Sequence, residues 1–297
     1  MNKSLFPRPI TAILLSVLGA VVGAAVMLFH AEATSESRAF IMTPGFYVWM
    51  FLLIVATIVL ALSVPVVLKQ LVELKGNFRG NRLEIISSCI IMCLLYVVPF
   101  IPKGPEGANV LTYQHAKINI LLGLGLIVAL QAMIGIWLVH AALRTEFKKV
   151  RVEHRQVARF QSLRDQLQCF LGVLGTLISL MTLSIGAQRN ALVAAGAIEA
   201  SKMPDANILT MGAYFTVLVA LSYLPTYWLL REVGRRICDT FFPTSSITPK
   251  SLSGWHSGRK SLEAVLNVPV GAGQSLQSGI AILAPILSGI VSVLLNV

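Results

Sequence analysis

The chain has 297 residues, of which 56% are hydrophobic and only 12% are charged, against roughly 25% charged residues in soluble domains. This composition excludes an ordinary soluble globular protein, and the sequence offers no segment apolar enough to build a separate soluble domain. The net charge of +11 is typical of nucleic-acid-binding proteins. The basic residues lie mainly in loops on one predicted side of the membrane, and this distribution explains the net charge better than nucleic-acid binding does. No nucleic-acid partner is therefore predicted.

Seven stretches of the chain contain no Asp, Glu, Lys or Arg. Each has at least 18 residues, enough for a helix to cross a hydrocarbon core about 30 Å thick. The stretches are 9–29, 39–68, 85–102, 118–143, 166–188, 206–230 and 264–297. The sequence therefore predicts an all-α, multi-pass membrane protein. It is a polytopic helical bundle of about seven transmembrane helices, made of three helical hairpins and a C-terminal helix rich in small residues.

Three regions follow from these stretches. Residues 1–230 are predicted to form a six-span transmembrane bundle with short loops. Residues 231–263, basic and rich in Ser, Thr and Pro, are predicted to be a cytoplasmic loop. Residues 264–297 are predicted to form the C-terminal hydrophobic helix.

The loops between the spans divide the basic residues unequally. When successive loops are assigned to alternate sides, 19 of the 24 Lys and Arg residues lie on one side and five on the other. Because cytoplasmic loops are enriched in Lys and Arg, the basic side is predicted to be cytoplasmic, with the N-terminus inside and the C-terminus outside. The short external loops favour a prokaryotic inner membrane. The lipid bilayer, with its anionic inner leaflet, is the predicted partner of the basic residues.

The first stretch resembles a signal peptide, because Lys3 and Arg8 precede it and Ala31-Glu32-Ala33 resembles a cleavage site. Its apolar run is longer than the 7 to 15 or so residues that are usual in signal peptides, which favours an uncleaved span. Cleavage would leave six spans in the same orientation. Gly19 and Gly23 form a Gly-x-x-x-Gly pattern, which predicts a close approach of another helix.

Several polar or special residues lie within the later spans. Pro65 and Pro225 are predicted to kink the second and sixth spans. Gln131 and His140 are the intramembrane polar side chains of the fourth span. Gln131 is predicted to form interhelical hydrogen bonds or to line a polar passage, and His140, close to the cytoplasmic end, is predicted to be a hydrogen-bonded or interfacial imidazole. The fifth span places small residues on one side, which predicts helix packing there. These residues include Gly172, Gly175 and Ser179.

The C-terminal stretch has the clearest pattern. A row of small residues faces a row of large aliphatic residues across the helix, since both rows follow spacings of three and four. The small row includes Ser275, Ser278, Ala281, Pro285, Ser288 and Ser292. One interpretation is a packing face between helices of one subunit. The other is a hydroxyl-lined passage around the axis of an oligomer.

The sequence contains no motif for an activated nucleophile, a metal-bound catalytic site or a phosphate-binding loop, so an enzyme, a cofactor and a metal are not predicted. The leading hypothesis is a homo-oligomeric pore-like or membrane-perturbing protein, such as an effector opened by a cytoplasmic partner, ligand or signal. The first alternative is a small transporter or exporter component. The second is a membrane anchor or scaffold that conducts nothing.

Overall fold

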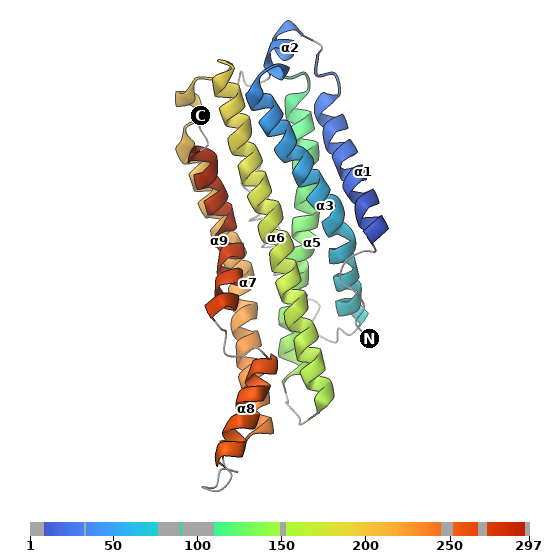
Figure 1. Cartoon of the computed structure of the whole chain (residues 1–297), viewed down its shortest axis with the longest axis vertical. Helices are drawn as coiled ribbons and strands as arrows, with labels where there is room; N and C mark the ends of the chain where they lie inside the picture. The colour runs from blue at the N-terminus through green and yellow to red at the C-terminus, as the bar shows by residue number, and fades with distance from the viewer. Residues whose placement is uncertain are drawn as a thin grey trace.

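The computed structural model describes residues 9–32, 34–76, 90, 110–148, 153–244, 252–266 and 272–294. Within these ranges the regular structure is entirely helical, which confirms the all-α prediction. The elements are α1 (Pro9–Leu28), α2 (Ser35–Ile41), α3 (Pro44–Gly76), α5 (Gln114–Glu146), α6 (His154–Ala194), η2 (Ala200–Lys202), α7 (Asp205–Phe241), α8 (Leu252–Leu266) and α9 (Ala272–Leu294). The long helices lie side by side along the longest axis of the molecule (Figure 1).

The bundle has two distinct ends, which we name the α2 end and the α8 end after the short helices found there (Figure 1). Helices α1, α6 and α9 run toward the α2 end, whereas α3, α5 and α7 run toward the α8 end. The described basic residues are divided between the two ends as the loops predict. The α2 end carries Arg38, Lys117, Arg189 and Lys202, and the α8 end carries the larger group from Lys69 and Arg144 to Arg259 and Lys260. Assignment of the α8 end to the cytoplasm stays a prediction.

Five helical segments are long and apolar enough to cross a membrane. They are Pro9–Leu28, Pro44–Leu74, Gln114–Glu146, His154–Ala194 and Ala200–Phe241. The apolar part of α9, Gly279–Leu294, is shorter, and the predicted third span, 85–102, lies outside the described residues apart from Ile90. The number of seven spans is therefore not confirmed, although these five segments suggest a membrane protein.

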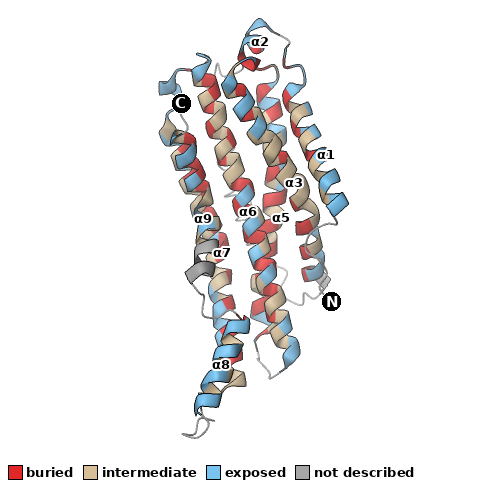
Figure 2. Ribbon diagram, viewed as in Figure 1, coloured by how far each residue is buried: buried red, intermediate tan, exposed pale blue. Residues whose placement is uncertain are grey.

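The outer helices expose large apolar side chains, as lipid-facing helices do. On α1 these include Ile10, Ile13, Leu14, Val17, Leu18 and Val21. Buried residues recur along α5, α6 and α7 (Figure 2), where Phe160, Phe170, Phe215 and Met133 are almost fully enclosed. A second apolar cluster, which includes Met27, Phe40 and Trp49, closes the α2 end.

Much of the predicted cytoplasmic loop over 231–263 is helical. Helix α7 continues to Phe241, and α8 occupies Leu252–Leu266. Helix α8 is held by tertiary contacts that a local pattern does not reveal. Arg259 pairs with Asp239 of α7 at 2.8 Å, and Leu266 is completely buried.

The C-terminal stretch 264–297 contains the end of one described helix and the whole of another, and residues 267–271 between them lie outside the described residues. Helix α8 ends at Leu266 and α9 begins at Ala272. The intervening sequence contains Pro269 and Gly271, and proline and glycine are the residues least compatible with a helix interior. The absence of charged residues therefore identifies the apolar stretch but not the end of α8 or the start of α9 within it.

Helices α3 and α7 continue through Pro65 and Pro225, and a kink at either proline stays a prediction. Helix α1 contacts α3 through the two glycines of its Gly-x-x-x-Gly pattern. A Cβ atom added to Gly19 would lie 2.6 Å from the carbonyl oxygen of Thr57, and one added to Gly23 would overlap the Thr57 hydroxyl. The close approach is thus made within one chain.

Candidate functional site

The small face of α9 lies against α6 and α7 in the same chain. A Cβ atom added to Gly175 of α6 would lie 2.6 Å from the carbonyl oxygen of Ala281, and one added to Gly212 of α7 would lie 2.8 Å from that of Pro285. Gly186 meets the Ser292 side chain in the same way. These contacts form a continuous interface, which we name the α9 seam.

Proline at position 285 alters the hydrogen bonding of this seam. Proline disrupts the regular hydrogen-bond ladder of a helix, and a neighbouring helix can satisfy a freed backbone group. The backbone N–H of Ile286 donates to the hydroxyl oxygen of Thr216 on α7 at 3.2 Å. The side-chain amide of Asn190 on α6 donates to the carbonyl oxygen of Ser292 at 3.1 Å. The seam is therefore fixed by polar contacts as well as by close packing.

The two faces of α9 differ as the sequence pattern predicts. On the small face, Ser288 is 9% exposed and Ser292 is 3% exposed. Pro285 is also buried, and Ala281 is half-buried. The side chains of Ser275 and Ser278 lie outside the described residues. The opposite face is exposed, and its residues include Ile280, Leu283, Leu287, Ile290 and Leu294.

The predicted packing residues of α6 have different surroundings. Gly175 is part of the α9 seam, and the Ser179 hydroxyl donates to its carbonyl oxygen at 2.7 Å. Gly172 is open, because a Cβ atom added there would meet no other described atom within 4 Å. Among the described residues, only part of the small-residue side of α6 therefore packs against another helix.

Gln131 and His140 do not form one polar site. They lie nine positions apart on α5, which separates them by about 13 Å along the helix axis. Gln131 is half-buried, and its side-chain oxygen accepts no hydrogen bond from the described residues. His140 lies beside the Trp137 ring, with 5.5 Å between the ring centroids, and it lines a cleft at the α8 end.

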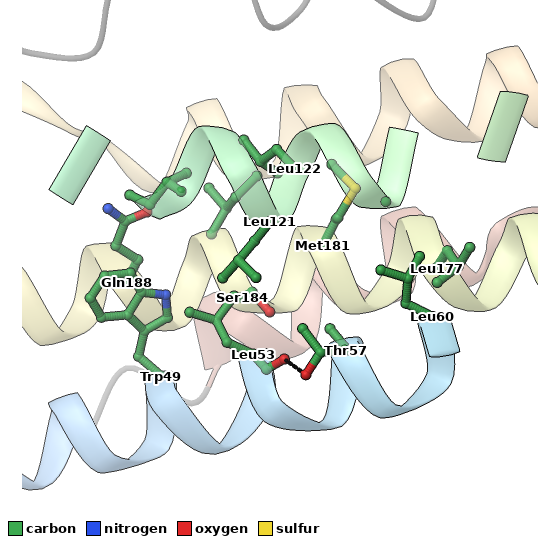
Figure 3. Close-up of a pocket in the computed structure, with 14 residues that line it drawn as sticks. Trp49, Leu53, Thr57, Leu60, Leu121, Leu122, Leu177, Met181, Ser184 and Gln188 are labelled. Atoms are coloured by element: carbon green, nitrogen blue, oxygen red, sulfur yellow. Dashed lines mark hydrogen bonds between the residues drawn. The ribbon is translucent and has the colours of Figure 1, made fainter. Parts of the chain in front are cut away.

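An apolar cavity lies between α3, α5 and α6 (Figure 3). It offers about 60 Å³ to the centres of water-sized molecules. Its lining includes Trp49, Leu53, Leu60, Leu121, Leu177 and Met181. The two hydroxyls at its wall are already hydrogen-bonded within their own helices, Thr57 to the Leu53 carbonyl and Ser184 to the Leu180 carbonyl. The cavity can accept a small apolar group, and neither Gln131 nor His140 lines it.

A second hollow lies between the last turns of α5 and the matching part of α7, and we name it the basic cleft. It offers about 720 Å³ to water-sized molecules. Its lining consists of His140, Leu143, Arg144, Thr145, Phe147, Lys148, Leu229 and Arg236. Three of these residues are permanently cationic at neutral pH, and none of the eight is acidic. The sequence indicates only the membrane side of these basic residues, because their convergence depends on the packing of α5 against α7.

The helices around the basic cleft are joined by ion pairs. Arg159 of α6 donates from Nε and Nη2 to the two carboxylate oxygens of Glu146 on α5, at 2.9 and 3.0 Å. Arg259 of α8 pairs with Asp239 of α7 and with Glu263 of its own helix. Hydrogen bonds to these carboxylates raise the pKa of Arg259 above its ordinary high value. The guanidinium therefore stays charged and keeps α8 attached.

The α2 end is closed by two buried cations. The Lys117 ammonium donates to the carbonyl oxygen of Met27 at 3.0 Å. Arg189 pairs with Asp205 at 2.7 Å and donates to the Met203 carbonyl at 2.8 Å. Both cations bind groups at helix ends or in loops of the same chain. The burial of Lys117 and Arg189 is therefore explained by these contacts, which stabilise the α2 end.

These features define an all-α protein with long apolar helices suited to a membrane, a basic cleft at one end and a closed opposite end. No cluster of three or more metal-ligating side chains occurs among the described residues. Comparison with protein-family models, with curated proteins and with solved structures finds no match to this chain.

Proposed function

We propose that this chain is a non-conducting membrane scaffold that holds a basic helical platform at the inner face of a prokaryotic inner membrane. The platform consists of residues 140–148, 153–166, 231–244 and 252–266. The observation that carries the proposal is the α9 seam. The small face that a pore would need along its axis is occupied by backbone contacts to α6 and α7, as expected for helix packing.

The lengths of the helices support a platform outside the lipid. Helix α6 has 41 residues and α7 has 37, which correspond to about 60 and 55 Å at roughly 1.5 Å per residue. A hydrocarbon core needs only about 30 Å. The two helices therefore continue well beyond any membrane they cross. The first turns of α6 and the last turns of α7 lie at the α8 end (Figure 1), and these turns contain Arg155, Arg159, Arg231 and Arg235.

The platform is also tied together, as a binding surface for a partner requires. Besides the Arg159–Glu146 and Arg259–Asp239 pairs, the Gln161 amide of α6 donates to the Val265 carbonyl at 3.2 Å. The Arg164 guanidinium reaches the Leu266 carbonyl at 3.4 Å. These contacts join α8 to α6 as well as to α7. A scaffold with this construction can present a fixed arrangement of charges to a cytoplasmic partner.

Thiol labelling tests the scaffold proposal in the full chain, after removal of the four native cysteines. Single substitutions Ser288→Cys and Ser292→Cys probe the seam, and Leu283→Cys and Leu287→Cys probe the opposite face. A scaffold protects all four from a membrane-impermeant maleimide, two by packing and two by lipid. The exposed Lys260→Cys variant is the positive control, labelled from the α8 side. Vesicles containing the protein should leak ions no faster than empty vesicles.

The pore hypothesis predicts the opposite result. Labelling at Ser288→Cys and Ser292→Cys, with protection at Leu283→Cys and Leu287→Cys, would show water along the small face. Together with ion leak, this pattern would overturn the scaffold proposal in favour of a homo-oligomeric pore. Such a pore would require α9 to leave the seam.

A transporter or exporter component is the second candidate, and the apolar cavity in Figure 3 favours it. The cavity lies among α3, α5 and α6, where a carrier would hold an apolar solute. Its small volume and lack of an ionisable lining residue among those described favour a packing defect over an ion-coupled site. We therefore keep the scaffold as the conclusion.

A further inference from the structure

The basic cleft combines charge with a position suited to the membrane surface. Helices α5 and α7 both run toward the α8 end. His140 and Leu229 line the part of the cleft nearer the centre of the bundle, and Phe147 and Arg236 line it two turns further toward the α8 end. The cleft is thus elongated along the helix axes. It lies at the α8 end, where most of the described basic residues are found.

No carboxylate is among the described residues that line the cleft. Glu146, the nearest acid along α5, is engaged by both Nε and Nη2 of Arg159. Arg236 pairs through Nε with Glu232 at 3.2 Å, but both side chains are about half exposed, so this pair is screened by water and weak. Three of the described residues that line the cleft, Arg144, Lys148 and Arg236, are basic and none is acidic, so this lining carries an excess of positive charge. Arginine also matches the paired oxygens of a phosphate group.

The apolar surroundings show which kind of anion fits. Leu143 and Phe147 are buried in the cleft wall. On the α7 side, Trp228 is 63% exposed and stands next to Leu229, and Leu221 is exposed two turns closer to the bundle centre. An exposed tryptophan between apolar and basic residues is typical of the membrane–water interface. A ligand that is apolar on one side and anionic on the other suits both surfaces.

We propose that the basic cleft binds the phosphate group of an anionic phospholipid, with Arg144, Lys148 and Arg236 around the phosphate and the acyl chains along the exposed apolar face of α7. The site goes beyond the scaffold proposal, which needs only packed helices and a rigid platform. It gives the chain a specific lipid partner in place of a general attraction to an anionic surface. Soluble phosphate compounds share the same chemistry, so the test separates the two sources.

The test uses the full chain reconstituted in phosphatidylcholine vesicles, with a brominated phosphatidylglycerol as the probe. Bromine quenches the fluorescence of a tryptophan it contacts, so Trp49, Trp137 and Trp255 are first replaced by Phe to leave Trp228 as the reporter. We expect quenching to saturate at a low fraction of brominated phosphatidylglycerol. The same fraction of brominated phosphatidylcholine should quench several-fold less.

The variant Arg144→Gln/Arg236→Gln is compared with Arg231→Gln/Arg235→Gln, which removes two exposed charges outside the cleft from neighbouring positions. We expect the cleft variant to need about tenfold more phosphatidylglycerol for half-maximal quenching, and the control variant to need less than twofold more. Equal shifts in the two variants would overturn the site and leave only diffuse attraction. Lys148→Gln, an exposed position that does not endanger folding, should give a smaller shift of the same sign.

Glycerol 3-phosphate separates the lipid from a soluble phosphate compound. If the lipid supplies the phosphate, millimolar glycerol 3-phosphate should leave the quenching by phosphatidylglycerol unchanged. Complete displacement would overturn the assignment to a lipid and assign the cleft to a soluble phosphate compound. Neither result depends on the thiol-labelling pattern of α9, so failure of this inference and failure of the scaffold proposal are distinguishable.

Discussion

At the scale of single residues, the α9 seam depends on a few polar contacts across helices. The sequence shows Ser288 and Ser292 on the same face as Ala281 and Pro285, because helix periodicity alone decides which residues share a face. It does not show what that face contacts. The partners Thr216 and Asn190 lie on other helices, and their relation to α9 depends on helix register, which no local pattern contains.

The Thr216→Val variant tests the hydrogen bond next to Pro285. Valine keeps the shape of threonine but removes the oxygen that accepts from the Ile286 N–H. Loss of this hydrogen bond should lower the free energy of unfolding by about 0.5 to 1.5 kcal/mol. The measurement is thermal unfolding of the purified protein in detergent.

The control for this variant is Thr210→Val on the same helix. The Thr210 hydroxyl is exposed and donates only to the Ala206 carbonyl one turn earlier. Its loss should change stability by no more than about 0.5 kcal/mol. Equal effects of the two substitutions would show that the contact from α7 to α9 contributes nothing specific.

At the scale of helices, the prediction succeeded where periodicity and hydropathy agree and failed where tertiary contacts decide. Helices α1, α3, α5, α6 and α7 follow the predicted apolar stretches. Helix α8 was missed because its sequence is rich in Ser and Gly and is stabilised by Arg259, whose partner Asp239 is 20 positions away. Such pairing is invisible to a local pattern.

The Gly19→Leu variant tests the contact of α1 with α3. A leucine side chain would overlap the backbone of α3 at Thr57 and Ile58, and backbone cannot move aside as a flexible side chain can. We expect α1 to separate from α3 and the unfolding temperature to fall by several degrees. Gly123→Leu is the matched control, because a Cβ atom there meets no described atom within 4 Å. Comparable unfolding temperatures for both variants would contradict this contact.

The Arg259→Gln variant tests how α8 is attached. It removes the ion pairs to Asp239 and Glu263 and the contact of the guanidinium with the Trp255 ring, 5.4 Å from its centroid. We expect faster amide hydrogen exchange across residues 252–266, with the exchange of α6 and α7 inside the bundle unchanged. Lys260→Gln, which alters an exposed neighbour, should leave the exchange rates as they are. Unchanged exchange in both variants would mean that apolar contacts alone hold α8.

At the scale of the whole molecule, the division of charge was the most informative property of the sequence. It separated the basic residues into two groups, and the fold brings each described group to its own end of the bundle (Figure 1). The basic cleft could not be predicted in the same way, because Arg144 and Arg236 are 92 positions apart. Only the parallel packing of α5 and α7 brings them to one hollow.

Self-association also belongs to this scale, and it stays a proposal. The glycines that suggested it, Gly19, Gly23 and Gly175, make their close contacts inside the chain. An oligomer would therefore have to use other surfaces, such as the open side of α6 at Gly172. The Gly172→Leu variant should then show less cross-linking in native membranes, while the stability of its monomer stays unchanged. Loss of cross-linking only in variants that unfold the monomer would argue against an interface there.

Reporter fusions test the orientation of the whole chain. Helix α9 runs from the α8 end to Leu294 at the α2 end, so the two ends of this helix belong on opposite sides if it crosses the membrane. Since the α8 end carries most of the basic charge, fusions at Gly104 and after Val297 should report the outside, and a fusion at Pro243 should report the cytoplasm. A cytoplasmic signal after Val297 would mean that α9, whose apolar part is only Gly279–Leu294, enters the membrane without crossing it. The basic platform would keep its side in that case, because its position depends on α6 and α7, whose lengths suffice to span the lipid without α9.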